Sequence, residues 1–222
     1  IGFTIHECKR RVSPEIVQKF HGLPVANVSD VMARIYGAQA DLQAMHDGSP
    51  MAGPAFTVKT RPGDNLMVHK ALELAPGGSV IVVDAGGNKS NAIIGEIMVA
   101  YAKLKHLAGI VINGAIRDSA EIRKGNFPVF ATGITHRGPY KDGPGEINVP
   151  ICLGNMVIEP GDLVLGDSDG VLSVPYDAVE KVYEAAMSKQ KAEERMLAEI
   201  EAGTYETAWV DEVIMQRLQD YN

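Results

Sequence analysis

The sequence predicts an α/β fold, and three observations support this class. Two apolar runs, Ser79–Val83 and Gly109–Ile112, each end in a glycine-bearing turn. The pattern between them is helical, which predicts a strand, a loop, a helix and a strand parallel to the first. From Gly145 onward the chain changes to short strands separated by proline and glycine, which indicates a second, β-rich layer. We therefore expect a parallel α/β core followed by a β layer.

The first 50 residues are expected to form an arm and two helices. Residues 1–12 show no clear period and predict an extended arm. Ser13-Pro14-Glu15 is typical of a helix start, because serine caps the first turn, proline fits it and glutamate favours the helix dipole. This helix should end near Gly22. A second short helix is expected from Ser29-Asp30 through Tyr36, followed by loop-like residues 38–54.

Residues 51–175 are expected to hold the α/β core and the β layer. The helix expected at Ala92–His106 is predicted to bury Ile93, Ile97, Tyr101 and Leu104, because these apolar residues recur at helical spacing. The predicted core elements are Ala55–Thr60 (strand), Leu66–Leu74 (helix), Ser79–Val83 (strand), Ala92–His106 (helix), Gly109–Ile112 (strand), Ser119–Lys124 (helix) and Pro128–Ala131 (strand). The predicted short strands are Glu146–Val149, Cys152–Leu153, Met156–Ile158, Leu163–Gly166 and Val171–Val174.

The C-terminal segment, residues 176–222, is expected to be a long helix and a tail. Asp177 to about Glu201 contains mostly strong helix formers, and Gly203 lies just beyond. The tail from Thr204 is amphipathic. Because no linker or internal repeat is evident, the whole chain, 1–222, is predicted to be a single domain.

Composition narrows the class of protein. The net charge of −7, without any block of Lys or Arg to offset it, argues against a nucleic-acid partner. No run of 18 apolar residues is present, so no membrane span is expected. Cys8 and Cys152 are too few and too far apart for a disulfide framework or a structural zinc site. A cytosolic enzyme or a protein-binding module is the expected class.

Arg117-Asp118 follows the Gly109–Ile112 strand and is the first candidate for chemistry. One interpretation is structural: Asp118 caps the next helix, and Arg117 is solvated. The other is functional: Asp118 binds a divalent cation and Arg117 neutralises charge that develops on a substrate. Hard cations such as Mg²⁺ take oxygen ligands and often only one or two carboxylates, so a single aspartate is sufficient.

Glu96 lies in an otherwise apolar turn and is the second candidate. It is either a surface residue in a first helical turn or a carboxylate that faces the crevice, since burial without a partner is costly. Gly95 favours the crevice, because a small residue allows a ligand to approach closely. The same turn exposes backbone N–H groups that can bind a substrate carboxylate.

Two other patterns do not complete a known motif. Gly86-Gly87-Asn88 follows a strand, but the full glycine pattern and the acidic residue of a dinucleotide-binding site are missing. Asp167-Ser-Asp169-Gly170 begins like a calcium loop, but its fifth and twelfth positions are Val171 and Ala178, so a β-turn is expected.

Several of these segments together resemble one known family. They are Gly53-Pro-Ala-Phe-Thr57, Gly63-Asp64-Asn65, Val82-Val83-Asp84-Ala-Gly-Gly-Asn88, Gly95-Glu96, Asn113-Gly-Ala-Ile-Arg117-Asp118 and Gly166-Asp-Ser-Asp-Gly170-Val. The chain resembles the 4-hydroxy-4-methyl-2-oxoglutarate aldolases, also called 4-carboxy-4-hydroxy-2-oxoadipate aldolases. That family shares its fold with the regulator of ribonuclease activity A. Glu96, twenty intervening residues and Arg117-Asp118 match its diagnostic motif, although many members carry Asp at the first position.

The resemblance implies a fold, a reaction and an assembly. The fold is a swivelling β/β/α domain with N-terminal helices and a long C-terminal helix. The reaction is class II aldol cleavage to pyruvate, dependent on Mg²⁺ or Mn²⁺, usually accompanied by oxaloacetate decarboxylase activity. The assembly is a homotrimer or a hexamer with sites between neighbouring subunits. The substrate implied is a small 2-oxo acid, as in aromatic catabolism.

The resemblance also implies roles for residues. Asp118 is the metal ligand, Arg117 stabilises the pyruvate enolate, and Glu96 orients water or the metal shell. Gly95 and the amides of Ile97 and Met98 bind the substrate carboxylate, and Asn65 lines the pocket. A neighbour's C-terminal helix is expected to supply Glu193 or Glu194, and the sequence leaves that choice open. Residues that could contact the distal half of the substrate are Arg61, His136, Arg137 and Lys141.

A non-catalytic binding module, like the ribonuclease regulator, is the alternative, because fold alone does not decide function. The presence of Glu96 with Arg117-Asp118 favours the aldolase.

Overall fold

A computed structural model of the protein describes residues 2–220. The chain separates into two compact units, one up to Ala186 and the other from Met187 onward. The division falls inside helix α6 (Val179–Glu201). Within the described part of the chain, none of the helices combines the length and apolar content that crossing a membrane requires.

The first unit is built on a mixed sheet whose centre is parallel. Strands β3 (Met51–Thr60), β4 (Val80–Ile94), β5 (Gly109–Ile116) and β6 (Val129–Ile134) pair in this order, each parallel to the next. The sheet is extended at one side by β7 (Gly145–Ile147) and β1 (Phe3–Ile5), and at the other by β2 (Gln43–Ala44). The parallel core predicted from the sequence is thus confirmed.

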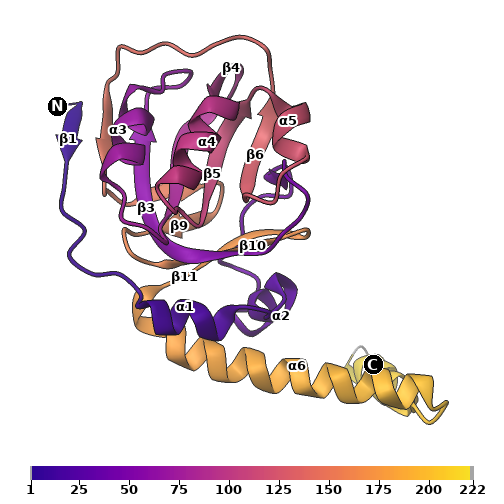
Figure 1. Cartoon of the computed structure of the whole chain (residues 1–222). Helices are drawn as coiled ribbons and strands as arrows, with labels where there is room; N and C mark the ends of the chain where they lie inside the picture. Colours follow the sequence, from indigo (N-terminus) through magenta and orange to yellow (C-terminus); the bar gives the residue numbers. More distant parts are fainter. Residues whose placement is uncertain (1, 221–222) are drawn as a thin grey trace. The chain divides into compact units, whose positions relative to one another are not determined.

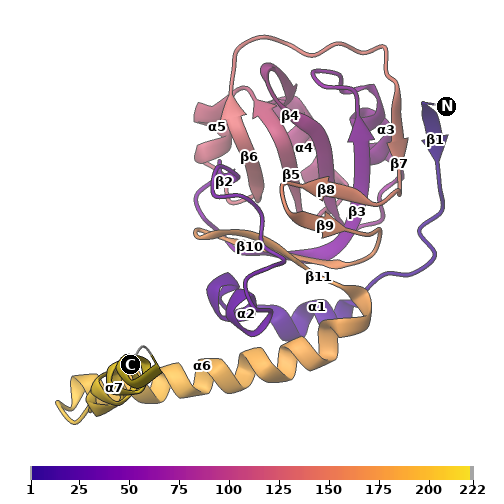
Figure 2. The same ribbon diagram turned by 180° about the vertical axis from the view of Figure 1, so that it is seen from behind.

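Helices cover one face of this sheet and a β layer covers the other. Figure 1 shows α3 (Leu66–Leu74), α4 (Glu96–Leu104) and α5 (Ser119–Arg123) on the near face. Seen from behind in Figure 2, a separate hairpin of β8 (Ile151–Leu153) and β9 (Met156–Ile158) covers the sheet. Strands β10 (Leu163–Asp167) and β11 (Gly170–Val174) form a second hairpin that pairs with the start of β3.

This layering is the β/β/α architecture that the resemblance implies, and alternation along β4 explains it. Ile81 and Val83 belong to the core on the helix side, whereas Val80 and Val82 belong to the core beneath the β layer. All four are fully buried. Successive side chains of a strand point to opposite faces, so a strand covered on both faces must be apolar throughout. The Asp167–Gly170 segment closes the β10–β11 hairpin, which confirms the predicted turn.

The N-terminal helices fit the sequence to different extents. Helix α1 (Pro14–Phe20) begins as predicted, with the Ser13 hydroxyl accepting the Ile16 N–H. Helix α2 (Val25–Val31) begins before the predicted Ser29 and ends before Tyr36. The reason is a distant contact: the Asp167 carboxylate accepts the Val25 N–H at 2.9 Å and satisfies the first turn. Local sequence does not carry that signal.

The path of β4 differs from the prediction. Beyond Asp84 the strand leaves regular pairing, and residues 85–94 of β4 face only residues 114–116 of β5. Gly86 and Gly87 take positive φ values of 65° and 68° within this excursion, a conformation that glycine adopts readily. Ala92–Ile94 then rejoin the sheet. The predicted helix start at Ala92 is therefore wrong, and α4 begins at Glu96.

The predicted core face of α4 is wrong as well. Ile97 is 80% exposed and Leu104 is 71% exposed, whereas Met98, Val99 and Ala102 are buried. Both sets have helical spacing. The way β4 delivers the chain into the helix decides which set faces the sheet.

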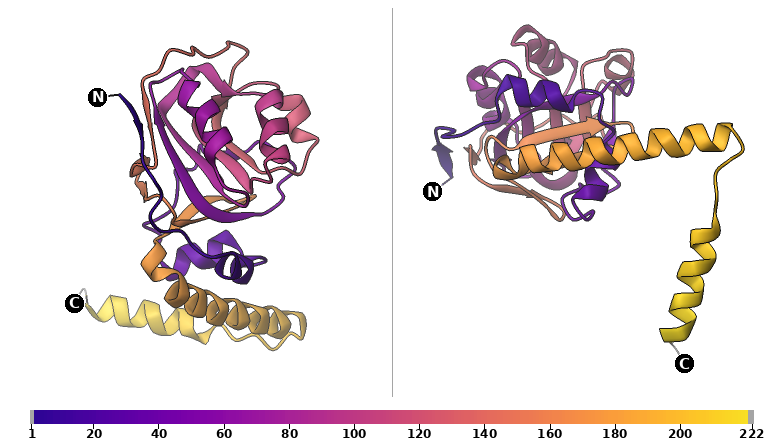
Figure 3. Two further views of the ribbon diagram at one scale, coloured as in Figure 1. Left: turned by 60° about the vertical axis from the view of Figure 1, so that its left-hand side comes forward. Right: turned by 90° about the horizontal axis from the view of Figure 1, so that it is seen from below.

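The C-terminal segment forms two helices. The first turns of α6 belong to the first unit, where the Tyr183 ring lies 5.6 Å from that of Phe20 on α1. The second unit contains the rest of α6 and, after a short loop, α7 (Ala208–Asp220), drawn in yellow in Figure 3. Its exposed apolar side chains include Leu197, Ile200, Trp209 and Ile214.

Candidate active site

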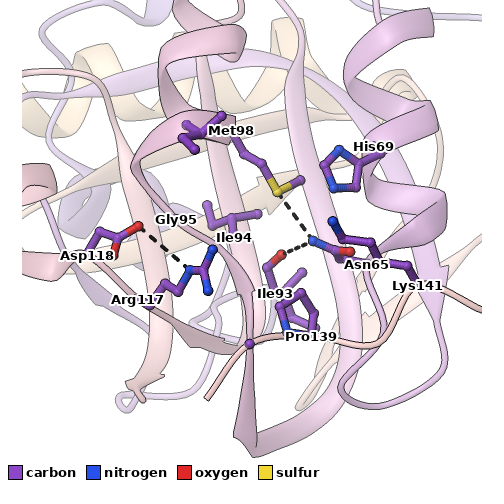
Figure 4. A pocket seen from close by; sticks show the side chains of 12 residues that line it. Asn65, His69, Ile93, Ile94, Gly95, Met98, Arg117, Asp118, Pro139 and Lys141 are labelled. Atoms are coloured by element: carbon purple, nitrogen blue, oxygen red, sulfur yellow. Dashed lines mark hydrogen bonds and ion pairs between the residues drawn. The ribbon is translucent and has the colours of Figure 1, made fainter. Parts of the chain in front are cut away.

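A pocket of about 310 Å³ opens where β4 and β5 end. Figure 4 shows its residues converging from α3, the β4–α4 turn, the end of β5 and the loop after β6. The lining residues are Asn65, His69, Ile93, Ile94, Gly95, Ile97, Met98, Arg117, Asp118, Gly138, Pro139 and Lys141. In open α/β sheets ligands bind outside the carboxyl ends of the strands, and this pocket has that position.

The ends of β4 and β5 are joined by two hydrogen bonds. The Arg117 N–H donates to the Ile94 carbonyl at 3.0 Å. One residue later, Oδ2 of Asp118 accepts the Glu96 N–H at 3.0 Å. These bonds bring the turn before α4 and the Arg117-Asp118 pair together, as the sequence predicts for the crevice.

Asp118 has a backbone conformation that is unusual for a residue with a side chain. Its φ of 55° and ψ of 34° place it in the left-handed region, at the N-cap of α5. Such a conformation costs on the order of 1 kcal/mol outside glycine and is frequent at functional sites. Within the described chain its carboxylate makes no capping bond to α5. It is directed instead to the start of α4, so the simple capping interpretation does not describe it.

Side-chain packing around position 95 leaves no room for a residue larger than glycine. A Cβ atom at this position would lie 3.0 Å from Cγ and 3.2 Å from Nε of Arg117, and would overlap Oδ2 of Asp118. The side chains of Arg117 and Asp118 therefore occupy the space that a larger residue would fill. They also approach each other, with Nε of Arg117 3.8 Å from Oδ2 of Asp118 (Figure 4).

Asn65 offers a buried acceptor at the pocket wall. It is 2% exposed, and its Nδ2 donates to the Ile93 carbonyl at 2.8 Å and approaches Sδ of Met98 at 3.4 Å. These bonds fix the amide plane (Figure 4). Its Oδ1 is buried and has no hydrogen-bond partner among the described residues. An unsatisfied buried oxygen is costly, so a donor on a bound molecule would be favoured here.

The first turn of α4 supplies one available amide. The Met98 N–H already donates to the Gly95 carbonyl at 3.1 Å. Among the described residues the Ile97 N–H has no such partner. Of the two amides expected to bind a carboxylate, only that of Ile97 is therefore available in this structure. The helix dipole adds partial positive charge at the same point.

Two further side chains, Lys141 and His69, complete the pocket, and His69 was missed from the sequence. Lys141 comes from the loop after β6, and His69 lies one turn after Asn65 on α3. Partial burial, and then the charge of Lys141, lower the pKa of His69 below its usual value. The i, i+4 spacing of Asn65 and His69 on one helix face was the available signal.

Most of the chain matches the model of a known family. The model of the RraA-like family, described as Aldolase/RraA, matches residues 25–173 of the chain. This protein belongs to the RraA-like family.

Individual RraA-like proteins show the range of the similarity. A protein from Halalkalibacterium halodurans named "Putative 4-hydroxy-4-methyl-2-oxoglutarate aldolase" is 38% identical over 180 residues, covering 81% of this chain and 86% of that protein. Streptomyces coelicolor RraAS2, of the RNase ES inhibitor RraA family, is 28% identical with a TM-score of 0.75. The match covers 83% of this chain and 96% of that chain. The RNA-processing inhibitor RraA from Thermus thermophilis is 30% identical with a TM-score of 0.63. The match covers 68% of this chain and 92% of that chain.

Three other residues predicted for the site, Glu96, Glu193 and Glu194, do not line the pocket. Glu96 contributes its backbone N–H, but its exposed side chain is not part of the lining. Glu193 and Glu194 lie on α6 in the second unit, where Glu193 pairs with Lys189 at 3.0 Å, and the pocket residues all belong to the first unit. Their roles stay predictions.

Among the four residues considered for the distal half of the substrate, Lys141 alone lines the pocket. Arg61 instead contacts Asp64 at 3.1 Å, and the Arg137 carbonyl accepts the Ala92 N–H at 2.8 Å.

Proposed function

We propose that this protein is an aldolase that cleaves 4-hydroxy-4-methyl-2-oxoglutarate or 4-carboxy-4-hydroxy-2-oxoadipate and releases pyruvate. The observation that carries the proposal is the placement of Arg117 and Asp118 side by side in one pocket, against the first turn of α4. Relatives named for this aldolase activity support the same reaction class.

The pocket contains groups suited to each end of the pyruvate half of the substrate. The Ile97 N–H and the α4 dipole would bind the carboxylate of the pyruvate half, and Lys141 would bind a carboxylate on the distal half. Arg117 would contact the 2-oxo oxygen through its planar guanidinium fork. When a base removes the proton of the C4 hydroxyl, C4 becomes a carbonyl and the bond between C3 and C4 breaks. The electron pair of that bond collects on the 2-oxo oxygen as an enolate, and a cation already in place stabilises the charge without reorganisation. Arg117 is about half-exposed, so a bound substrate can reach it.

The donor set fits a hard divalent cation. Asp118 offers a partly exposed carboxylate at the pocket, and Mg²⁺ is often held by one or two carboxylates with water and substrate oxygens filling the other positions. No cluster of three or more His, Cys, Asp or Glu suited to a metal occurs in residues 2–220. Asp118 would therefore hold Mg²⁺ or Mn²⁺ with help from water and substrate. Such an ion supplies Lewis acidity when bound.

The same geometry supports a proposal of oxaloacetate decarboxylase activity. Loss of carbon dioxide from oxaloacetate leaves the pyruvate enolate, the species that Arg117 would stabilise. One pocket can therefore serve both reactions, and we propose that this one does.

We also propose that the protein is a homo-oligomer, a trimer or a hexamer, whose subunits share their sites. Ile97, Tyr101 and Leu104 present an exposed apolar strip on α4, and Ile97 also borders the pocket. Apolar strips of this kind mark interaction surfaces. A neighbour covering it would lie beside the pocket and could contribute Glu193 or Glu194. A cytosolic location and a part in aromatic catabolism stay predictions.

A coupled assay for pyruvate release tests the function. The protein is given oxaloacetate or 4-hydroxy-4-methyl-2-oxoglutarate with Mg²⁺, and then with EDTA. We expect pyruvate from both substrates with Mg²⁺ and a loss of at least about tenfold with EDTA, because charge on the enolate is then less stabilised. Absence of metal-dependent pyruvate from either substrate would contradict the aldolase and favour a binding module like the RNA-processing inhibitor.

A further inference from the structure

Asp64 is the most completely buried acidic side chain near the pocket, and four donors converge on it. Its side chain is 0% exposed. Oδ1 accepts the Leu66 N–H at 2.9 Å. Oδ2 accepts the N–H groups of Asp142 and Gly143 at 2.8 Å and 2.9 Å, and Nη2 of Arg61 at 3.1 Å. One carboxylate thus connects the start of α3 to a loop far along the chain.

The loop that Asp64 holds carries Lys141. Asp142 is the next residue after Lys141, so the bond to its N–H fixes the peptide that follows the lysine. On the other side of Lys141, the Tyr140 N–H donates to the Gly63 carbonyl at 2.9 Å, and the Asn65 N–H donates to the Tyr140 carbonyl at 3.0 Å. The Arg61 guanidinium lies 5.6 Å from the centre of the Tyr140 ring. Lys141 is therefore held between two fixed peptides, one of which depends on Asp64.

Asn65, by contrast, has anchors of its own. Its side chain is fixed by the bond to the Ile93 carbonyl, which does not involve Asp64. The pocket group most dependent on Asp64 is accordingly Lys141, one of the cations that would bind an anionic substrate.

We propose that Asp64 is a positioning residue that holds Lys141 at the pocket. In this way Asp64 sets the affinity of the pocket for an anionic substrate. Asp64 does not line the pocket, and its effect passes through the backbone of residues 141–143. The kinetic consequence rests on the proposed aldolase function, whereas the structural consequence does not.

Asp162 provides a matched control. It is 3% exposed, and its two carboxylate oxygens accept the backbone N–H groups of Tyr176 and Glu159 at 2.8 Å and 2.9 Å. It has the same residue type, nearly the same burial and the same kind of bond, but neither of these partners adjoins a pocket residue in the chain, whereas Asp142, a partner of Asp64, adjoins Lys141. A purely structural role for Asp64 would make Asp64→Asn and Asp162→Asn behave alike.

The first experiment compares these two variants in steady-state kinetics. Asparagine has one acceptor oxygen, so Asp64→Asn turns an amide group toward N–H donors on one side. We expect KM for oxaloacetate to rise about tenfold while kcat stays within about threefold, because Arg117 and Asp118 are untouched. Asp162→Asn should leave KM unchanged. A fall in kcat with KM unchanged would overturn the proposal.

A double-mutant cycle with Lys141→Ala tests the route of the effect. If Asp64 acts through Lys141, the two substitutions together should raise KM no further than Lys141→Ala alone, since coupled residues are not additive. Additive effects would overturn the proposal. If Asp64→Asn does not fold, Arg61→Ala takes its place, because Arg61 is 42% exposed and contacts both Asp64 and Tyr140. Arg61→Ala is expected to raise KM about two- to fivefold with little change in kcat.

Amide hydrogen exchange separates this inference from the proposed function. Asp64→Asn, but not Asp162→Asn, should speed amide exchange in residues 140–143 at least tenfold, because local opening governs exchange. If the wild-type protein releases no pyruvate, the aldolase proposal fails. The positioning role of Asp64 is then tested by amide hydrogen exchange alone. Unchanged exchange in this loop would overturn the positioning role whatever the activity.

Discussion

The carboxylate of Asp118 accepts the backbone N–H of Glu96 at 3.0 Å, although Asp118 occupies the N-cap of α5 and Glu96 opens α4. Helix α4 follows β4 and helix α5 follows the neighbouring strand β5, so this hydrogen bond connects the starts of the two helices. The bond places the Asp118 carboxylate beside Gly95 and the Arg117 side chain, and it fixes the position from which Asp118 would reach a cation.

Arg117→Lys should lower kcat for pyruvate release by on the order of 100-fold, because a planar fork aimed at the developing enolate is replaced by a point charge. Steady-state kinetics with oxaloacetate measure it. Arg123→Lys, on the exposed side of α5, is the control and should behave as wild type. Near-normal turnover of Arg117→Lys would reject the role given to Arg117.

Asp118→Ala should abolish the response to Mg²⁺, because the pocket loses its carboxylate ligand. Two readouts apply: the stimulation of pyruvate release by Mg²⁺, and the binding of Mn²⁺ measured by electron paramagnetic resonance. Glu121→Ala removes the same charge three residues later, on α5, and should retain both. Retention of Mn²⁺ binding in Asp118→Ala would place the metal elsewhere.

Gly95→Ala should reduce kcat at least about tenfold, because the new methyl group displaces Arg117 and Asp118 from their present positions. The protein should still fold, since both displaced side chains are partly exposed. Gly77→Ala is the control: a Cβ there meets its nearest neighbour at 3.6 Å, an ordinary contact. The measurements are kinetics and a thermal melt, and full activity in Gly95→Ala would contradict the packing argument.

The lowered pKa of His69 predicts a pH dependence of stability. Burial, and secondarily Lys141, depress the folded pKa below the unfolded value of about 6.5. Between these two values the unfolded state binds more protons, so stability falls as the pH drops below about 6.5 and is unaffected above it. His69→Gln should lack this component.

Urea unfolding from pH 8 to pH 5 compares His69→Gln with wild type. The difference should be small, because the imidazole is partly exposed and solvent screens it. An NMR titration gives a second check: Lys141→Ala should raise the pKa of His69, but only part of the way, since burial is the larger cause. A titration above the usual histidine value would contradict the assignment.

Ile97→Lys combined with Leu104→Glu should weaken the proposed assembly, because charge is placed on the exposed apolar strip of α4. Light scattering after gel filtration should show a smaller species. Circular dichroism should be unchanged, since neither side chain is in the core. The control Lys103→Glu changes a charge on the same helix without touching the strip. An unchanged mass for the double variant would locate the interface elsewhere.

Much of the fold was predictable because its signals are local. Helix α3 has the predicted bounds, Leu66–Leu74, since the Gly63-Asp64-Asn65 turn starts it and Pro76-Gly77 follows its end. The parallel strands are predictable because they are apolar on both faces. Glu96, Arg117 and Asp118 were predicted at one strand edge from the topology, and in the structure the Glu96 N–H donates to Asp118, which lies beside Arg117.

The errors at α4 share one cause. Ala92-Ile93-Ile94 is an apolar run that suits the start of a helix or the end of a strand, and its pairing with β5 decides between them. Once α4 starts at Glu96, Met98 and Ala102 face the sheet, and Ile97 and Leu104 face outward. His69, similarly, becomes a pocket residue only because α3 lies beside the β4–α4 turn.

The sequence by itself determined the elements of the core, the order of its layers and the chemical groups at the strand ends, because each depends on neighbouring residues and on rules of topology. The tertiary structure decided the rest. It turned the Asp118 carboxylate to the start of α4, left Ile97 as the one available amide of the expected pair, and connected Asp64 to the loop that carries Lys141. These contacts join residues far apart in the chain, and the packing of whole elements, rather than any local preference, sets their distances.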